Sequence, residues 1–155
     1  MRAIIIRKEL LFLALFVFLI FPTMASAQVR ISGLNDFSFG SWDGVSDISS
    51  SDQFCIWSGQ GNSLFMTAIG NGSNNTFQLR GSANNLDMKI EFRINQGAYI
   101  QLEPNKFSPF INPRNNTPNC FGGSNAELKV TIPQSSLESG EEGFYYGQLI
   151  LMVMP

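Results

Sequence analysis

Residues 86–95 read LDMKIEFRIN, with an apolar side chain at every even position and a polar or charged one at every odd position. Successive side chains of a β-strand point to opposite faces, so this period of two predicts an antiparallel strand with one buried and one wet face. Further stretches of this kind alternate with turn-forming clusters of Gly, Asn and Ser. The other predicted strands are 30–39, 54–57, 63–69, 76–80, 98–102, 126–132 and 145–154, and the turns are 70–75, 82–85 and 122–125.

The rhythm of these strands predicts the fold class. Short strands with frequent turns and no alternation of strand and helix are typical of an all-β antiparallel sandwich. One helical turn is expected at 135–138. Residues 28–155 suit a single domain with its own core. The aromatic residues expected in that core are Phe37, Phe39, Trp42, Phe54, Trp57, Phe65, Phe77 and Phe92.

The last predicted strand ends in an apolar run, Leu149–Met154, which Pro155 follows. In a strand, one face would carry Leu149, Leu151 and Val153, and the other Ile150, Met152 and Met154. A strand that is apolar on both faces is normally buried inside a sheet. As an edge strand it would be an aggregation hazard unless something covered it. The run therefore predicts a strand that needs a partner.

The N-terminal segment 1–27 has the three parts of a secretory signal peptide. Basic residues precede an apolar stretch at 10–21, and an Ala-Ser-Ala site follows at 25–27. The apolar stretch is short for a membrane span, so we expect cleavage before Gln28 and no membrane span afterwards; an uncleaved anchor is the alternative. The sequence thus predicts an exported protein.

The two cysteines, Cys55 and Cys120, fit an exported domain. An oxidising compartment favours a disulfide between them, worth roughly 4 kcal/mol for a loop of this length, and two free thiols are the alternative. Zinc is not expected, because the chain has no histidine and no C-x-x-C pair. We expect no metal and no cofactor.

Composition also argues against several functions. Without histidine, the usual general base and the Ser-His-Asp and Cys-His arrangements are excluded. No spacing singles out a carboxylate pair for glycoside hydrolysis, so we expect no enzyme. The net charge of −2 comes with no basic patch, so neither nucleic acid nor an anionic membrane surface is expected as a partner.

The segment 103–120, here called the excursion, contains four prolines and several asparagines that break regular structure. It is expected to be a long surface excursion, held at its end by Cys120. Four aromatic residues flank or occupy it: Tyr99, Phe107, Phe110 and Phe121. They either pack beneath the loop or face outward, where they would contact a receptor.

Three features together resemble a known family. They are the motif FSFGSW at 37–42, the widely spaced cysteine pair, and the ending GFYYGQL at 143–149. They are similar to secreted bacterial pilin-type domains, namely subunits of chaperone–usher fimbriae, including the spore-coat-U-like branch. The resemblance implies an immunoglobulin-like sandwich that lacks its last strand. A periplasmic chaperone fills the gap first, and the N-terminal extension of the next subunit fills it afterwards, by β-strand addition.

The resemblance assigns roles to both ends of the chain. Leu149–Met154 would border the gap, and the carboxylate of Pro155 would be held by basic residues of the chaperone. Val29, Ile31 and Gly33 alternate as a donor strand should, although they also suit the domain's own first strand. Without a separate extension, the subunit would accept a strand but not donate one, which predicts a tip or terminating position.

The departures from the family are Met154, where a tyrosine is common, and the short segment before the FSFGSW motif. The implied partners are other fimbrial subunits, the chaperone, an outer-membrane usher and a surface or host receptor. The implied location is the periplasm in transit and then a fimbria on a Gram-negative cell. The alternative function is a free-standing secreted β-sandwich that binds carbohydrate or protein.

Overall fold

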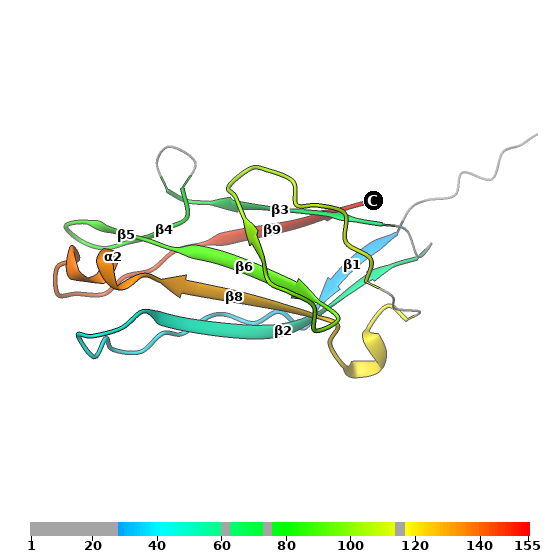
Figure 1. Ribbon diagram of the computed structural model, residues 1–155, viewed down its shortest axis with the longest axis horizontal. Coiled ribbons are helices and arrows are strands. Elements are labelled where there is room, and N and C mark those ends of the chain that lie inside the picture. Colours follow the sequence, from blue (N-terminus) through cyan, green and yellow to red (C-terminus); the bar gives the residue numbers. More distant parts are fainter. Residues whose placement is uncertain (1–27, 60–62, 73–75, 114–116) are drawn as a thin grey trace, which may run out of the picture.

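The computed structural model describes residues 28–59, 63–72, 76–113 and 117–155, and the predicted signal peptide lies outside them. The strands form two layers (Figure 1). One is a five-stranded sheet in the order β1-β2-β8-β6-β7, and the other contains the pair β3-β9 and the hairpin β4-β5. The large sheet consists of β1 (Val29–Ser32), β2 (Ile48–Ser58), β8 (Ala126–Ile132), β6 (Lys89–Ile94) and β7 (Ile100–Leu102). The second layer consists of β3 (Phe65–Gly70), β9 (Leu149–Met154), β4 (Gln78–Arg80) and β5 (Asn85–Asp87).

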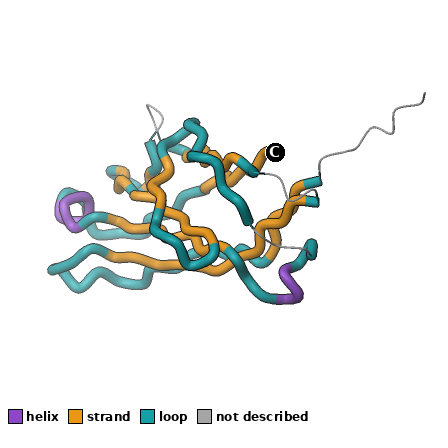
Figure 2. Tube along the Cα trace, turned by 45° about the vertical axis from the view of Figure 1, so that its right-hand side comes forward, coloured by secondary structure: helices purple, strands orange, loops and turns teal. Residues whose placement is uncertain are grey.

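All the strand pairs are antiparallel, so the predicted all-β antiparallel sandwich is confirmed. The described residues also form two short helices, η2 (Cys120–Gly122) and α2 (Gln134–Glu138). Figure 2 shows them at opposite ends of the strands. The expected helical turn at 135–138 is therefore present and starts one residue earlier. Among the described residues, no helix is long and apolar enough to cross a membrane.

The core lies between the two layers. Its largest fully buried side chains come from β2, β6 and β8 on one side and from β3 and the residue before it on the other. They are Phe54, Ile56, Ile90, Phe92, Leu128, Leu64 and Met66. Of the aromatics expected in the core, Phe77 is also buried, and Phe37 and Phe39 pack against the core half-buried. The prediction is wrong for Trp42, Trp57 and Phe65, which are half-buried and belong to neither core cluster.

The strictly alternating stretch 86–95 forms two strands rather than one. β5 pairs with β4 in the small layer, whereas β6 pairs with β8 and β7 in the large sheet. Met88 lies at the change of layer, and its N–H donates to the carbonyl of Phe77 at 2.8 Å. The apolar face still points inward throughout, with Leu86, Ile90 and Phe92 buried. Strands that switch layers in this way make the corners of sandwiches.

Two N-terminal predictions need correction. The strand expected at 30–39 ends at Ser32, because Gly33 takes a positive φ of 83° that turns the chain away. The strand expected at 54–57 begins at Ile48 instead. Its first half, ISSSDQ, is serine-rich and resembles a turn in the sequence. The structure pairs it with β8 from Ile48↔Ile132 onward, so tertiary pairing overrides local propensity here.

A tyrosine anchors the chain before the last strand. The hydroxyl of Tyr145 accepts a hydrogen bond from the N–H of Glu141 at 2.9 Å and lies 2.6 Å from Asn84 Oδ1. Its ring packs against the small core cluster of Leu79, Leu86 and Ile132. This bond from a tyrosine hydroxyl to backbone four residues upstream resembles the tyrosine corner of immunoglobulin-like sandwiches.

Candidate strand-pairing site

Strand β9 is paired on one side only. It runs antiparallel to β3 along its whole length, from Gly70↔Leu149 to Phe65↔Met154. No strand of the described part of the chain pairs with its other side. The ladder begins at Leu149 rather than at residue 145 as predicted. Upstream, Tyr146 pairs with Arg80, which ties this segment to the end of β4.

The far edge of β3 is covered by the excursion. The N–H and C=O of Leu64 both bond to Ile111 at 2.8 Å, and the carbonyl of Met66 accepts from the N–H of Ser108 at 2.7 Å. The Ser108 hydroxyl accepts in turn from the Met66 N–H at 3.0 Å. Ile111, Ser108 and Pro113 are buried. The excursion lies at the surface and is held at Cys120 as predicted, but its described residues also cover the edge of β3 as an irregular edge strand.

These hydrogen bonds fix which backbone groups of β9 are free. In an antiparallel strand, the N–H and C=O of one residue point to the same side, and the side alternates along the chain. Leu64 and Met66 point to the excursion, so Phe65, Thr67 and Ile69 point to β9. Their partners are Met154, Met152 and Ile150. The backbone groups of Leu149, Leu151 and Val153 must therefore point to the open side.

The side chains of β9 follow the alternation that the sequence predicts. Leu149, Leu151 and Val153 are half-buried and pack against the main core. Ile150 and Met152 point outward, with 47% and 38% of their surface exposed. The residues with free backbone groups are thus the ones that contribute to the core. The open side of β9 therefore offers a row of backbone donors and acceptors, and the same residues place their apolar side chains on the core. An added strand uses this geometry, since it pairs with the backbone and packs its own alternate side chains on the core.

The structure places the N-terminal segment in the domain's own sheet. β1 pairs with β2 through Val29↔Ser58 and Ile31↔Ile56, and both apolar side chains pack against the main core. Gly33 lies just beyond the strand. Of the two roles that the sequence left open for Val29, Ile31 and Gly33, this structure has the domain's own first strand.

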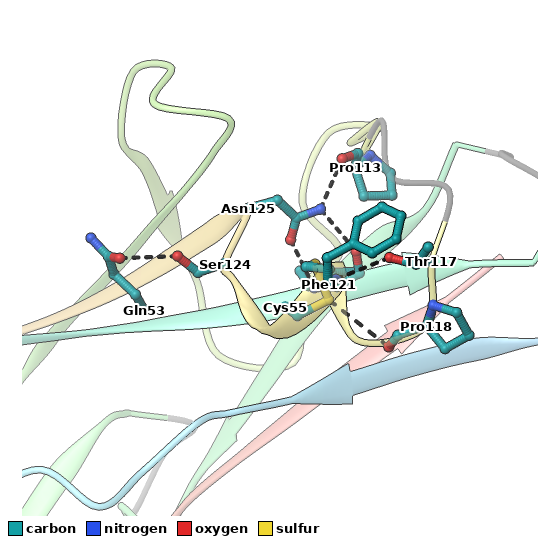
Figure 3. The surroundings of a disulfide bond; sticks show 10 residues. Gln53, Cys55, Pro113, Thr117, Pro118, Phe121, Ser124 and Asn125 are labelled. Carbon is teal, nitrogen blue, oxygen red and sulfur yellow. Dashed lines mark hydrogen bonds between the residues drawn. A yellow bond between two sulfur atoms is a disulfide. The ribbon is translucent and has the colours of Figure 1, made fainter.

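The predicted disulfide is present and joins β2 to η2 (Figure 3). The sulfurs of Cys55 and Cys120 are 2.05 Å apart. Beside it, Asn125 accepts from the Ile56 N–H at 2.9 Å and donates to the carbonyls of Ile56 and Pro113 at 2.9 and 2.8 Å. This asparagine fixes the end of the excursion to β2. Sequence reasoning missed it, because nothing in an asparagine-rich chain distinguishes one structural amide from the others.

The four aromatics near the excursion have two kinds of environment. Phe107 and Phe110 are 62% and 68% exposed, and their ring centroids lie 6.0 and 4.1 Å from that of Phe65. Phe121, beside the disulfide, is 88% exposed. Tyr99 is half-buried instead, and its hydroxyl donates to Glu127 at 2.6 Å. Receptor contact by any of them stays a prediction.

Tyr99 belongs to a charged network on the outer face of the large sheet. Arg93 donates to Glu127 from Nε at 2.9 Å and from Nη2 at 2.5 Å, and its guanidinium lies 4.8 Å from the centre of the Tyr99 ring. Hydrogen bonds from Tyr99 and then from Arg93 lower the pKa of Glu127. The bond to Glu127 raises the pKa of Tyr99 above its ordinary value. The network therefore favours the ionised form of Glu127 and the protonated form of Tyr99.

In the described part of the chain, no group of three or more His, Cys, Asp and Glu residues could hold a metal ion. The candidate site of this protein is the open side of β9, where backbone hydrogen-bonding groups stand beside apolar side chains that pack on the core.

No protein-family model and no curated protein matches this chain. Among solved structures, it is similar to a chain from the structure described as "Chaperone-tip adhesin complex is vital for synergistic activation of CFA/I fimbriae biogenesis". The TM-score is 0.58 at 16% identity, and the match covers 83% of this chain but only 41% of that chain. At this identity the likeness shows the fold. It agrees with the predicted pilin-type β-sandwich, while the spore-coat-U-like branch stays a prediction.

Proposed function

We propose that this chain is a non-enzymatic structural or adhesive subunit of a bacterial surface fimbria, and that β9 accepts a strand from another chain. The observation that carries the proposal is the open side of β9. Three residues there combine unpaired backbone groups with side chains that pack on the core. The likeness to a chain of a fimbrial chaperone–adhesin complex supports the same function.

The proposal implies a sequence of partners. A periplasmic chaperone would cover β9 first, an outer-membrane usher would receive the complex, and a neighbouring subunit would replace the chaperone at the cell surface. The pairing of β1 with β2 supports a tip or terminal position, since it leaves Val29 and Ile31 no role as a donor strand. A tip position would also place the subunit where a host or surface receptor is met.

The test is strand addition to the full chain. A peptide with apolar residues at alternate positions should convert an aggregating or strand-swapped protein into a soluble one-to-one complex, measured by size-exclusion chromatography with light scattering. Amide exchange then gives a residue-level signature. The N–H groups of Leu149, Leu151 and Val153 should become protected, whereas those of Ile150 and Met152, which face β3, should change little.

A peptide of the same composition with its apolar residues grouped together is the matched control, because it cannot place alternate side chains over the core. The proposal fails if the chain alone is a stable monomer at high concentration and its β9 amides gain no protection from either peptide. That result would favour the free-standing β-sandwich that binds carbohydrate or protein.

A further inference from the structure

A row of polar side chains crosses three neighbouring strands on the outer face of the large sheet. The register pairs Gln53 of β2 with Glu127 of β8, and Glu127 with Arg93 of β6. The turn at 95–96 and Ser124 lie beside this row. Together they line a hollow of about 410 Å³, which is within the range of small-molecule sites. Figure 3 shows Gln53 and Ser124 joined by a hydrogen bond of 2.9 Å, away from the disulfide.

The hollow carries no net charge among its described residues, because its one cation and its one anion are paired. Its cation, Arg93, bonds to its anion, Glu127, through two nitrogens, and Tyr99 holds the second carboxylate oxygen. The pair is partly shielded, with 33% and 13% of the two side chains exposed. A ligand that approaches this wall meets fixed, opposite charges rather than an excess of one sign. The site therefore favours a neutral polar ligand over an ionic one.

The hollow also offers more hydrogen-bonding groups than the described part of the chain uses. Gln53 accepts from Ser124 through Oε1, and no described residue accepts from its Nε2. Asn95 donates to the carbonyl of Asn112, which leaves its Oδ1 for another donor. The amide of Gln96 has no partner among the described residues and lies at the rim. Each amide can both donate and accept, as the hydroxyl of a bound molecule also does.

The turn at the rim is built from residues that suit it poorly. Asn95 and Gln96 have φ values of 50° and 60°, and Gly97 closes the turn with a bond to Ile94 at 2.9 Å. Two successive positive φ values define a type I′ turn, in which glycine is preferred at the second central position. Gln96 occupies that position at a cost in stability. Such strain is often retained where a side chain has a function.

We propose that this hollow binds a neutral carbohydrate through the amides of Gln53, Asn95 and Gln96 and the Ser124 hydroxyl. Sugar hydroxyls match an array of groups that donate and accept together, and the Arg93–Glu127 pair supplies a rigid polar wall. None of the described residues that line the hollow is aromatic, so affinity rests on hydrogen bonds and is expected to be on the order of millimolar. The site lies on the large sheet, so it is independent of strand addition at β9.

The test is a titration of the isotope-labelled full chain, alone or in the complex that keeps it soluble, followed by NMR. The probes are lactose, N-acetyllactosamine and mannotriose, with 3′-sialyl-N-acetyllactosamine as the anionic counterpart. At least one neutral sugar should shift the side-chain amide signals of Gln53, Asn95 and Gln96. The amide of Gln101, which is exposed on β7 outside the hollow, should not move.

Two substitutions at one position separate strain from binding. Gln96→Gly should raise the melting temperature and weaken sugar binding about tenfold, because glycine relieves the turn and removes the amide. Gln96→Ala should weaken binding equally without the stabilisation, and Gln101→Ala should bind as the original chain does. The inference is overturned if no neutral sugar shifts these amides, if only the sialylated probe does, or if Gln96→Gly binds a neutral sugar as well as the original chain does.

Discussion

The β3-β9 sheet has two edges, and the chain treats them in opposite ways. The edge of β3 is covered by the excursion, whose Ile111, Ser108 and Asn105 bond to it. No strand of the described residues is hydrogen-bonded to the edge of β9, although β1 approaches it without pairing. The cover is proline-rich and the open edge is a charge-free apolar run. Both edges belong to the same small sheet and pack on the same core. Whether an edge is covered therefore depends on the excursion and not on the core.

Proline explains how an irregular segment can cover an edge without creating another one. Pro104, Pro109 and Pro113 lack a backbone N–H, so the excursion bonds to β3 but offers a broken ladder to any further strand. β9 has none of the usual protections, which are charge, proline or a bulge. One edge of this sheet is thus protected and the edge of β9 is not. An unprotected apolar edge is the physical reason to expect a partner strand at β9.

The largest effect should come from releasing the end of the cover. Replacing both Cys55 and Cys120 with serine removes a link across 65 positions and should lower the free energy of unfolding by about 4 kcal/mol. Urea denaturation measures the loss. Amide exchange at Leu64 should accelerate more than at core positions of β8, because the excursion loses its anchor to β2. Equal acceleration at both places would contradict the view that the disulfide serves the covered edge.

A pair of proline substitutions tests the open edge. The Met152 N–H faces β3, so Met152→Pro removes a ladder hydrogen bond and should cost about 1–3 kcal/mol. The Val153 N–H faces the open side, where proline is tolerated. Val153→Pro should therefore destabilise little more than its control, Val153→Ala, and yet abolish binding of the alternating peptide. Thermal unfolding and peptide titration measure the two effects.

The two prolines thus separate stability from partner binding. If both variants lose the same stability, the assignment of free backbone groups on β9 is wrong. If Val153→Pro binds the peptide as well as Val153→Ala does, strand addition does not occur at this edge.

A smaller effect tests a single contact of the cover. Ser108→Ala removes the hydroxyl that accepts from the Met66 N–H at 3.0 Å, which leaves a buried donor unsatisfied and should cost about 1–2 kcal/mol. Ser49→Ala, at an exposed position of β2, is the matched control and should be nearly neutral. Chemical denaturation measures both variants. A Ser108→Ala variant as stable as the control would mean that this hydroxyl does not maintain the covered edge.

The sequence predicts one edge better than the other. The apolar run Leu149–Met154 predicts a strand and divides its side chains into two faces, because the period of a strand is a local property. Which face packs on the core does not follow from the run, since both faces are apolar. The pairing of Ser108 and Ile111 with β3 could not be predicted, since it depends on backbone groups that every sequence has. For the same reason the strand 48–53 was missed, and the change of layer at Met88 left no trace in the alternation.

The smallest effect should come from the network of Arg93, Glu127 and Tyr99 on the large sheet. It tests whether the difference between the two edges is independent of the other layer. The pKa of Glu127 is lowered from 4.5 by Tyr99 and Arg93. Ionised Glu127 therefore stabilises the folded state fully above about pH 5, and this contribution is lost as the pH falls through the lower folded-state pKa. The pKa of Tyr99 is raised from 10.0, so its share is present below about pH 10 and is lost above its folded-state value. Glu127→Gln should cost about 1 kcal/mol or less at pH 7.

The same substitution should flatten the acid side of the stability profile, measured by thermal unfolding between about pH 3 and 7. Because Glu127 lies on the outer face of the other layer, amide exchange at Leu64 and Leu151 should be unchanged at neutral pH. A change at either residue would mean that the two layers are coupled, and the contrast between the edges of β3 and β9 would then depend on the whole sandwich rather than on the segment that covers one of them.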